Sequence, residues 1–233
     1  MWPLQIPGEL VMGTGAPEIV EQSLEWRSLP VNRWMMVAAA VIFLINLPNY
    51  YNIFPHLVKC ASVWRRNISL ENNIQLVRSR DMSLWASVLP VTLVTAYYGL
   101  AGGRYLYLCP EAWRTLAVLG GLAALGLLRQ MIYLLLGTRV RGRQTWQAAH
   151  RCDFNFFVLL GALFLVTEAV ISICGTSDYN ARIVFWVETG LLYLLFFVRK
   201  SQILGSNYSQ FTTFLYLCAL ELLPTGILIW ISL

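Results

Sequence analysis

The chain has 233 residues, of which 58% are hydrophobic and only 12% are charged. Soluble domains carry about one quarter charged residues, so this composition excludes an ordinary soluble domain and indicates an integral membrane protein. The net charge of +5 is concentrated in particular connections, and we interpret it as a signal of membrane topology and not as a nucleic-acid-binding surface. We therefore expect the lipid bilayer as a partner and no nucleic acid.

Residues 1–33 contain no apolar stretch that could cross a bilayer, and we expect them to form a loosely structured extracytoplasmic segment. Residues 34–233 are predicted to form one transmembrane domain. Its six apolar stretches are residues 34–47, 83–101, 113–136, 154–174, 181–198 and 211–231. Because a backbone in lipid must satisfy its own hydrogen bonds, all six are predicted to be helical. The predicted fold is an all-α polytopic membrane bundle with about six transmembrane helices and additional interfacial amphipathic helices.

The first apolar helix is expected to end or kink at Pro48. In the long connection after it, residues 52–82, apolar and basic residues alternate around Trp64, which predicts an amphipathic helix lying on the membrane. An apolar stripe continues at helical spacing through Leu70, Ile74 and Val77. A similar but shorter connection is predicted for residues 138–153.

Basic residues are distributed unevenly between the predicted connections. Those after the first, third and fifth helices contain eleven lysines and arginines, whereas the N-terminal segment and the remaining connections contain five. The basic connections include Arg65, Arg66, Arg139, Arg141 and Arg143. Since basic connections stay in the cytoplasm, both termini are predicted to be periplasmic. A binding surface for anionic lipid or phosphate is the alternative interpretation of these residues.

Four charged residues fall inside predicted helices, where an isolated charge costs a few kcal/mol. They are Arg129, Glu168, Glu188 and Glu221. At about 1.5 Å per residue, Arg129 and Glu221 differ in depth by roughly 5 Å, so we predict an ion pair between the third and sixth helices. Glu168 and Glu188 are predicted at one depth near the outer ends of neighbouring helices, which makes them candidates for lining a polar cavity. The interpretation we favour is that these acids only join helices by hydrogen bonds.

Two further features concern the packing of the third and sixth helices. Pro224 leaves the carbonyl of Leu220 without its helical donor, which predicts a bend beside Glu221. Such a broken helix marks either a transporter site or a packed polar bend. Small residues in the third helix, Ala117, Gly121 and Ala124, predict that it packs closely inside the bundle.

Motifs of enzyme chemistry are absent from the sequence. The five cysteines and two histidines form no metal-binding pattern, and no phosphate-binding, dinucleotide-binding, zinc-protease or serine-hydrolase motif occurs. We therefore expect no cofactor and no metal. The sequence does not decide whether the protein is an enzyme, but the absence of a nucleophile–base set favours a protein without its own catalytic machinery.

The C-terminal sequence FTTFLYLCALELLP resembles an uncharacterised family of bacterial membrane proteins, domain-of-unknown-function family 4271, found in the Bacteroidota. Sequences of that family end in F-x-x-F-L-Y-L-C-x-x-E-x-L-P. The matching residues here are Phe211, Phe214, Leu215, Tyr216, Leu217, Cys218, Glu221, Leu223 and Pro224. The resemblance implies a multi-pass protein of the bacterial inner membrane, and it implies that Glu221 and Pro224 belong to a family motif. It brings no activity with it.

Two classes of function fit these observations. The favoured hypothesis is an accessory or scaffold subunit in envelope biogenesis, which works within a membrane-protein complex. The alternative is a small transporter, or a protein that handles lipid-linked substrates, with Arg129, Glu168, Glu188 and Glu221 in a polar cavity.

Overall fold

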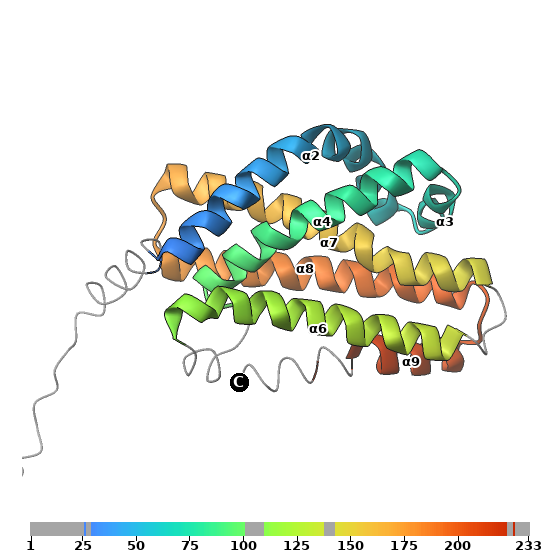
Figure 1. Ribbon diagram of the computed structural model, residues 1–233. Helices are drawn as coiled ribbons and strands as arrows, with labels where there is room; N and C mark the ends of the chain where they lie inside the picture. Colours follow the sequence, from blue (N-terminus) through green and yellow to red (C-terminus); the bar gives the residue numbers. More distant parts are fainter. Residues whose placement is uncertain (1–25, 27–28, 101–109, 138–142, 223–225, 227–233) are drawn as a thin grey trace, which may run out of the picture.

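The computed structural model describes residues 26, 29–100, 110–137, 143–222 and 226, and all regular structure in them is helical. The elements are α2 (Pro30–Ser62), α3 (Arg65–Glu71), α4 (Ile74–Tyr97), α6 (Glu111–Gly137), α7 (Arg143–Cys174), α8 (Asp178–Gly205), α9 (Gln210–Leu217) and the π-helix η1 (Cys218–Leu222) (Figure 1). The predicted all-α class is therefore confirmed for the described residues.

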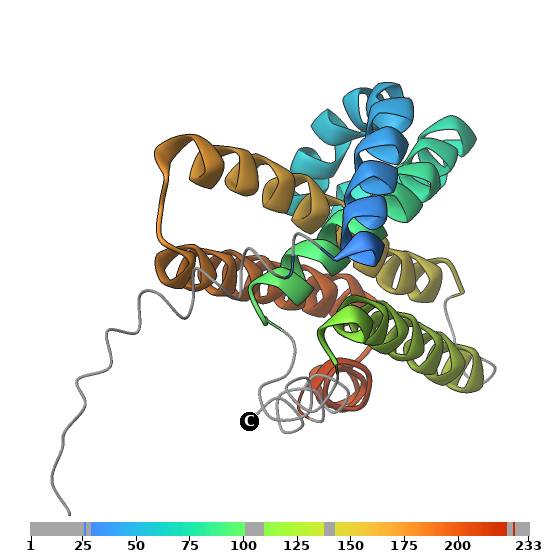
Figure 2. The same cartoon turned by 60° about the vertical axis from the view of Figure 1, so that its left-hand side comes forward.

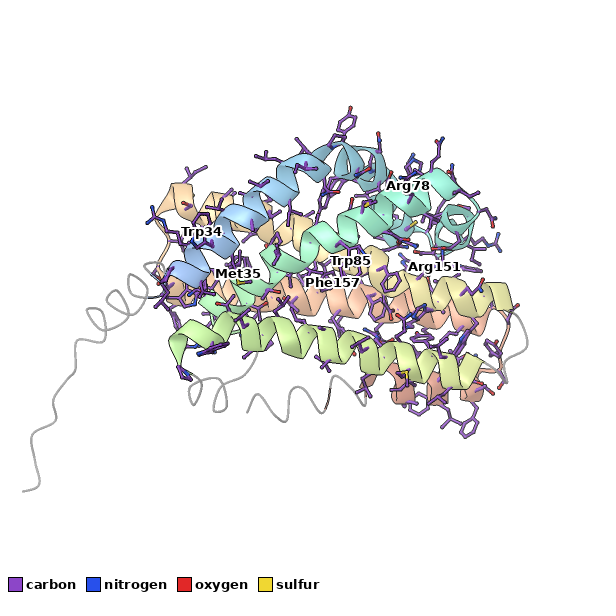
Figure 3. The ribbon with its side chains drawn as sticks, viewed as in Figure 1. Trp34, Met35, Arg78, Trp85, Arg151 and Phe157 are labelled. Carbon is purple, nitrogen blue, oxygen red and sulfur yellow. The ribbon has the colours of Figure 1, made fainter. Side chains whose placement is uncertain are left out.

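Four of these helices are long and apolar enough to cross a membrane: α2, α6, α7 and α8. At most 22% of the most apolar 18-residue window of each is buried, so many of their large apolar side chains face outward. Trp34 on α2 is 72% exposed and Trp85 on α4 is 74% exposed, and both lie on the outer surface (Figure 3). Soluble proteins seldom expose apolar surface on this scale, so the helices are suited to a bilayer.

The predicted number of about six transmembrane helices stays a prediction. Residues 83–97 of the second apolar stretch form the second half of α4, whose first half carries Arg78, Arg80 and Asp81. The stretch 211–231 begins with α9 and η1, and the structure describes little of this stretch beyond Leu222.

Helix α4 lies at the centre of the described bundle. It packs against α2, α6 and α7, and every residue from Pro90 to Ala96 is buried. Helices α2 and α3 lie on one side of α7 and α8, and α6 and α9 lie on the other (Figure 2). Because the part of α4 from Pro90 to Ala96 is buried all round, it is apolar without being amphipathic.

The closest contact between α4 and α7 depends on a glycine. A Cβ atom at Gly161 of α7 would lie 2.6 Å from the Cβ of Ser87 on α4, closer than two carbon atoms can approach. Ser87 in turn donates to the carbonyl of Ser83 at 2.8 Å and shares a hydrogen bond with the hydroxyl of Tyr50 on α2. The absent side chain therefore lets three helices meet around one buried polar group.

Of the two outcomes expected at Pro48, an end or a kink of the first helix, the end is wrong. Helix α2 continues through Pro48 and Pro55 to Ser62, and its second half turns away from its first half (Figure 1). Leu57 is fully buried in a cluster with Ile53 and Cys60, so this part of α2 packs against the bundle. Its position on the membrane surface stays a prediction. Each proline removes one hydrogen bond, but the buried face on α4 keeps the helix intact.

The predicted apolar stripe beyond Trp64 is also wrong. Helix α3 ends at Glu71 and α4 begins at Ile74, with Asn73 capping the new helix by accepting from the backbone N–H groups of Gln75 and Leu76. Ile74 is 85% exposed. An N-cap asparagine interrupts the helical period, so the three apolar positions do not share a face.

The connection predicted for residues 138–153 is shorter than expected. Helix α7 begins at Arg143, and Asp153 lies well within it. Helix α8 likewise extends past its apolar stretch to Gly205 and includes Lys200. Charged residues end the apolar stretches, but the helices themselves continue past these charges. They are therefore longer than a helix needs to be to cross the hydrocarbon core.

The small residues of α6 do not pack inside the described bundle. Ala117, Gly121 and Ala124 are exposed, and no atom lies within 4 Å of a Cβ built at Gly120 or Gly121. The helix touches the bundle with a different face, which includes Val118. The predicted close packing is therefore wrong for the described residues, because small residues permit an approach of helices without specifying which face is used.

Candidate functional site

The contact predicted between Arg129 of α6 and Glu221 of η1 is present in the structure. Nη2 of Arg129 donates to Oε2 of Glu221. The Glu221 side chain is 0% exposed and the Arg129 side chain is 27% exposed. Glu221 would be costly as an isolated charge in hydrocarbon. It is paired with the arginine that its predicted depth in the membrane indicated.

Two further charges, which lie outside the apolar stretches of the sequence, complete this contact. Oδ2 of Asp153 on α7 lies 3.0 Å from Nε of Arg129, and its Oδ1 accepts from Nζ of Lys200 on α8 at 2.8 Å. Lys200 also donates to Oε1 of Glu221. The four residues form a closed ring, the ion tetrad, in which each charge contacts two charges of opposite sign.

The ion tetrad is neutral as a unit when its two cations and two anions are all ionised. The side chains of Lys200 and Glu221 are fully buried, and that of Asp153 is 10% exposed. Removing charges from water costs several kcal/mol per ion, and close contacts offset this cost only when every charge is paired. The ring meets that condition and joins α6, α7, α8 and η1.

Aromatic rings cover the cations of the ion tetrad. Nζ of Lys200 lies 4.8 Å from the ring centre of Tyr133 and 5.0 Å from that of Phe196, and the guanidinium carbon of Arg129 lies 5.5 Å from Phe196. Such cation–π contacts are worth up to about 2 kcal/mol when they are shielded from water. The ring of His150 packs edge-on against Tyr133 with centres 4.4 Å apart. The site is therefore enclosed by both charge pairing and aromatic packing.

Glu221 enters the ion tetrad from a π-helix. Residues Cys218–Leu222 form η1, which comes directly after α9. A π turn widens the helix locally and changes the direction of the side chains beyond it. Pro224, which lies outside the described residues, cannot donate to the carbonyl of Leu220, so the sequence itself disfavours a regular α-helix here. The predicted bend at Pro224 cannot be compared with the described part of the chain.

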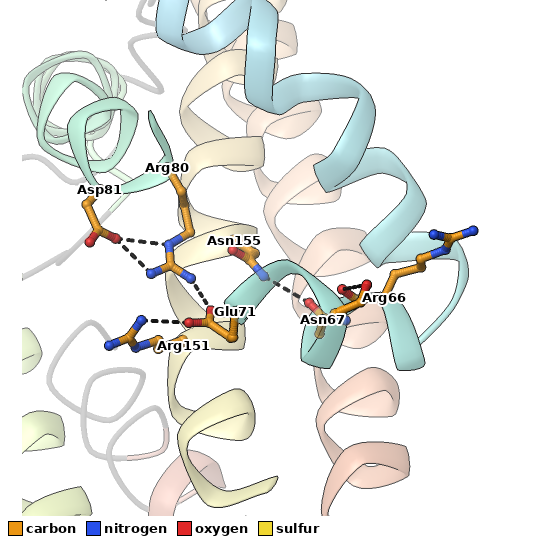
Figure 4. A network of polar contacts seen from close by, with 8 residues as sticks. Arg66, Asn67, Glu71, Arg80, Asp81, Arg151 and Asn155 are labelled. Atoms are coloured by element: carbon orange, nitrogen blue, oxygen red, sulfur yellow. Dashed lines mark hydrogen bonds and ion pairs between the residues drawn. The ribbon is translucent and has the colours of Figure 1, made fainter. Parts of the chain in front are cut away.

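A second group of charges lies where α3, α4 and α7 meet (Figure 4). The side chain of Arg80 is 1% exposed and contacts Glu71 and Asp81, with Nη2 2.8 Å from Oδ1 of Asp81. Glu71 also accepts from Nη1 of Arg151 at 2.6 Å. Two arginines of the predicted basic connections are therefore packing residues that fasten α3 to α4 and α7.

The remaining basic residues of the predicted connections differ in their surroundings. Arg65 and Arg66 are exposed on α3, and Arg65 packs over the ring of Trp64. Arg139 and Arg141 lie outside the described residues, and Arg143 is the first residue of α7. Arg65 and Arg66 are thus the two of these five residues whose exposure the structure describes.

Glu168 and Glu188 take separate partners. The hydroxyl of Tyr98 donates to Oε2 of Glu168 at 2.9 Å, and the hydroxyl of Thr167 donates to Oε1 of Glu188. Thr167 and Glu168 are consecutive on α7 and so are separated by about 100° around the helix. The two acids therefore make contacts on different sides of α7, which fits acids that join helices by hydrogen bonds better than a common cavity.

The chemistry available in the described residues is that of acids, amines and hydroxyls. Among these residues no group of three or more histidines, cysteines or acids could hold a metal ion. Cys60, Cys152, Cys174 and Cys218 are free thiols. The ion tetrad can bind helices together and can exchange protons between adjacent carboxylate and amine groups.

Asp153 and Lys200 are the site residues that sequence reasoning missed. Each lies one or two residues beyond an apolar stretch, at the predicted cytoplasmic ends of neighbouring helices. Both residues could have been found by comparing the membrane depths of all charged residues, including those just beyond the ends of the apolar stretches. Such a comparison would have matched them with Arg129 and Glu221, which carry the opposite charges.

The comparison with known proteins identifies the family of this chain but assigns no chemistry to it. No curated protein and no solved structure matches the chain. The family model described as Domain of unknown function (DUF4271) matches residues 33–231. This match covers nearly the whole sequence, including every residue of the ion tetrad, so the chain belongs to the DUF4271 family.

Proposed function

We propose that the protein is a six-span protein of the bacterial inner membrane, with both termini in the periplasm, that serves as an accessory or scaffold subunit in envelope biogenesis. The segment 1–33 would then be an extracytoplasmic extension of a single transmembrane domain, residues 34–233. In this proposal the protein organises a membrane-protein complex and performs no chemistry of its own.

The closed pairing of the ion tetrad carries this proposal. Arg129 and Glu221 are the charges that a transport site would use, but each is held by two partners of opposite sign. A group that binds a solute or passes a proton must break these contacts, which costs several kcal/mol in a buried site. The arrangement therefore favours a rigid connection between helices over a cavity that opens and closes.

The surface best suited to a protein partner is the exposed side of α3. Arg65 and Arg66 project from a short helix whose opposite side, Asn67 and Leu70, is buried against the bundle. The nearby contacts of Arg80 and Glu71 hold this helix in place. A fixed helix with exposed arginines can bind an acidic partner with little loss of conformational entropy.

The test compares charge reversals at the two ends of the bundle. Arg65→Glu with Arg66→Glu should remove the partner complex recovered from native membranes by crosslinking, and should abolish complementation of a deletion strain. Arg33→Glu with Arg182→Glu is the matched control, because both residues are exposed at the opposite end. Equal losses in the two double variants, with both proteins stably expressed, would contradict a specific α3 interface.

The transporter alternative makes the opposite prediction for the two outer acids. Glu168→Gln and Glu188→Gln each remove one ionisable group while keeping the hydroxyl contact with Tyr98 or Thr167. A scaffold should still complement the deletion strain with either variant. Loss of complementation by well-folded Glu→Gln variants, together with unchanged activity of the α3 variants, would replace the scaffold proposal by the transporter.

A further inference from the structure

A groove of about 600 Å³ lies between α2, α4 and α7, at the end of the bundle where α2 begins and α4 ends. Its size falls within the range of about 300–1,000 Å³ that is usual for ligand sites. Leu44, which lines the groove on α2, is 65% exposed, so the groove is open sideways toward the surrounding membrane. The groove is distinct from the ion tetrad, because none of the tetrad residues lines it.

The lining of the groove changes from polar to apolar along its length. Trp26, Tyr98 and Glu168 lie at the end nearest the start of α2, whereas Phe43 and Pro90 lie at the other end. From Tyr98 to Pro90 the groove follows α4 for about 12 Å at the rise of an α-helix. One leaflet contributes about 15 Å of the hydrocarbon core, so the groove matches a leaflet in both length and polarity.

The polar end offers a carboxylate. Glu168 is held there by the hydroxyl of Tyr98. The Trp26 side chain at the same end is 5% exposed, and its indole Nε1 is closed off from solvent, so it offers no donor to a ligand in the open groove. A carboxylate at the edge of hydrocarbon is costly, so Glu168 favours a ligand that supplies a cation.

We propose that this groove binds one phospholipid with a zwitterionic ammonium–phosphate headgroup, of the phosphatidylethanolamine class. The ammonium group pairs with Glu168, and an acyl chain lies between α2 and α4. An anionic headgroup without an amine supplies no cation for Glu168. This inference goes beyond the scaffold proposal and uses other residues, so either can fail without the other.

The experiment uses the full-length protein in mild detergent with equal amounts of phosphatidylethanolamine and phosphatidylglycerol of identical acyl chains. Native mass spectrometry counts the lipids retained on each chain. The wild type should retain one phosphatidylethanolamine with a preference of about fivefold, which corresponds to an ion pair of about 1 kcal/mol. Glu168→Gln should abolish the preference, and Ala40→Trp, which fills the groove from α2, should abolish retention of both lipids.

Matched controls separate the groove from general effects on the protein. Glu188→Gln makes the same substitution in an acid outside the groove, and Ala124→Trp adds the same bulk to an exposed position of α6. Both should bind lipid as the wild type does. The proposal is overturned if the wild type retains no lipid or shows no headgroup preference, or if the controls lose binding as the groove variants do. If Ala40→Trp does not fold, the headgroup preferences of Glu168→Gln and Glu188→Gln are compared with each other. Loss of the preference in Glu168→Gln alone supports the proposal, and any other result overturns it.

Discussion

At the scale of single residues, each member of the ion tetrad depends on two others. Asp153 contacts both Arg129 and Lys200, and Glu221 contacts the same two cations from the other side. Removing one side chain therefore leaves a ring with an unbalanced charge, whereas removing one cation and one anion leaves a neutral pair. Net charge, more than the number of contacts, should determine the stability of the variants.

We predict that Arg129→Leu destabilises the protein by about 3–5 kcal/mol, because it leaves two buried carboxylates with one cation. Adding Glu221→Leu should restore part of this loss, since Lys200 and Asp153 remain paired at 2.8 Å. For a domain of this size the single substitution should lower the melting temperature by on the order of 10 °C. Thermal unfolding in detergent, followed by tryptophan fluorescence, measures both variants.

The matched control for this experiment is Arg129→Leu with Lys200→Leu, which removes two residues of the ring but leaves two anions. It should be less stable than either single variant. If this double variant and the Arg129→Leu, Glu221→Leu variant unfold at the same temperature, pairing of charge is not what stabilises the site.

The pair Arg129 and Glu221 could be predicted from the sequence because both lie inside apolar stretches, where a charge demands a partner. Asp153 and Lys200 could not be predicted in the same way. Each borders an apolar stretch, where a charge is ordinarily solvated, and only the continuation of α7 and α8 past those borders buries them. Hydropathy locates the hydrocarbon-facing length of a helix, which is shorter than the helix itself.

At the scale of helices, the contact between α4 and α7 depends on how closely their backbones approach. We predict that Gly161→Ala destabilises the protein by about 1–3 kcal/mol, because the new methyl group would overlap Ser87 and force the helices apart. Gly120→Ala in α6 should be neutral or slightly stabilising, since the position is open and alanine favours helix. Melting temperatures of the two variants provide the comparison. Similar destabilisation in both would show that loss of glycine itself, and not overlap with Ser87, is responsible.

The lengths of the apolar stretches predict that helices occur there. They do not predict where each helix ends or which of its faces packs against other helices. Pro48 suggested either an end or a kink of the first helix, and α2 continues past it because Tyr50, Ile53 and Leu57 are buried beyond it. The stripe of small residues on α6 suggested a packed face, yet contacts of Thr115 and Val118 select another one. Both outcomes depend on neighbouring helices, and a single segment of sequence carries no information about which neighbour it meets.

At the scale of the whole molecule, the two ends of the bundle differ in charge. The end that contains α3 carries exposed Arg65, Arg66 and Arg78, together with Arg151 of α7. Figure 3 shows Arg78 and Arg151 toward this end of the molecule. The turn between α7 and α8 lies at the opposite end (Figure 1). Connections that the sequence assigned to one side of the membrane are therefore gathered at one end of the fold, and the positive-inside rule would place that end in the cytoplasm.

Cysteine labelling tests this orientation with a residue the protein already has. Cys174 is exposed at the end of α7, so in a chain whose other cysteines are alanine it should react with a membrane-impermeant maleimide added to spheroplasts. Ser69→Cys places a thiol on the exposed side of α3, and it should react only after the membrane is permeabilised. The opposite pattern would place α3 in the periplasm and both termini in the cytoplasm, and it would assign the basic surface of α3 to an extracytoplasmic partner. Labelling at both positions before permeabilisation would mean that the two ends of the described bundle face the same compartment, which helices of this length cannot do while spanning the bilayer.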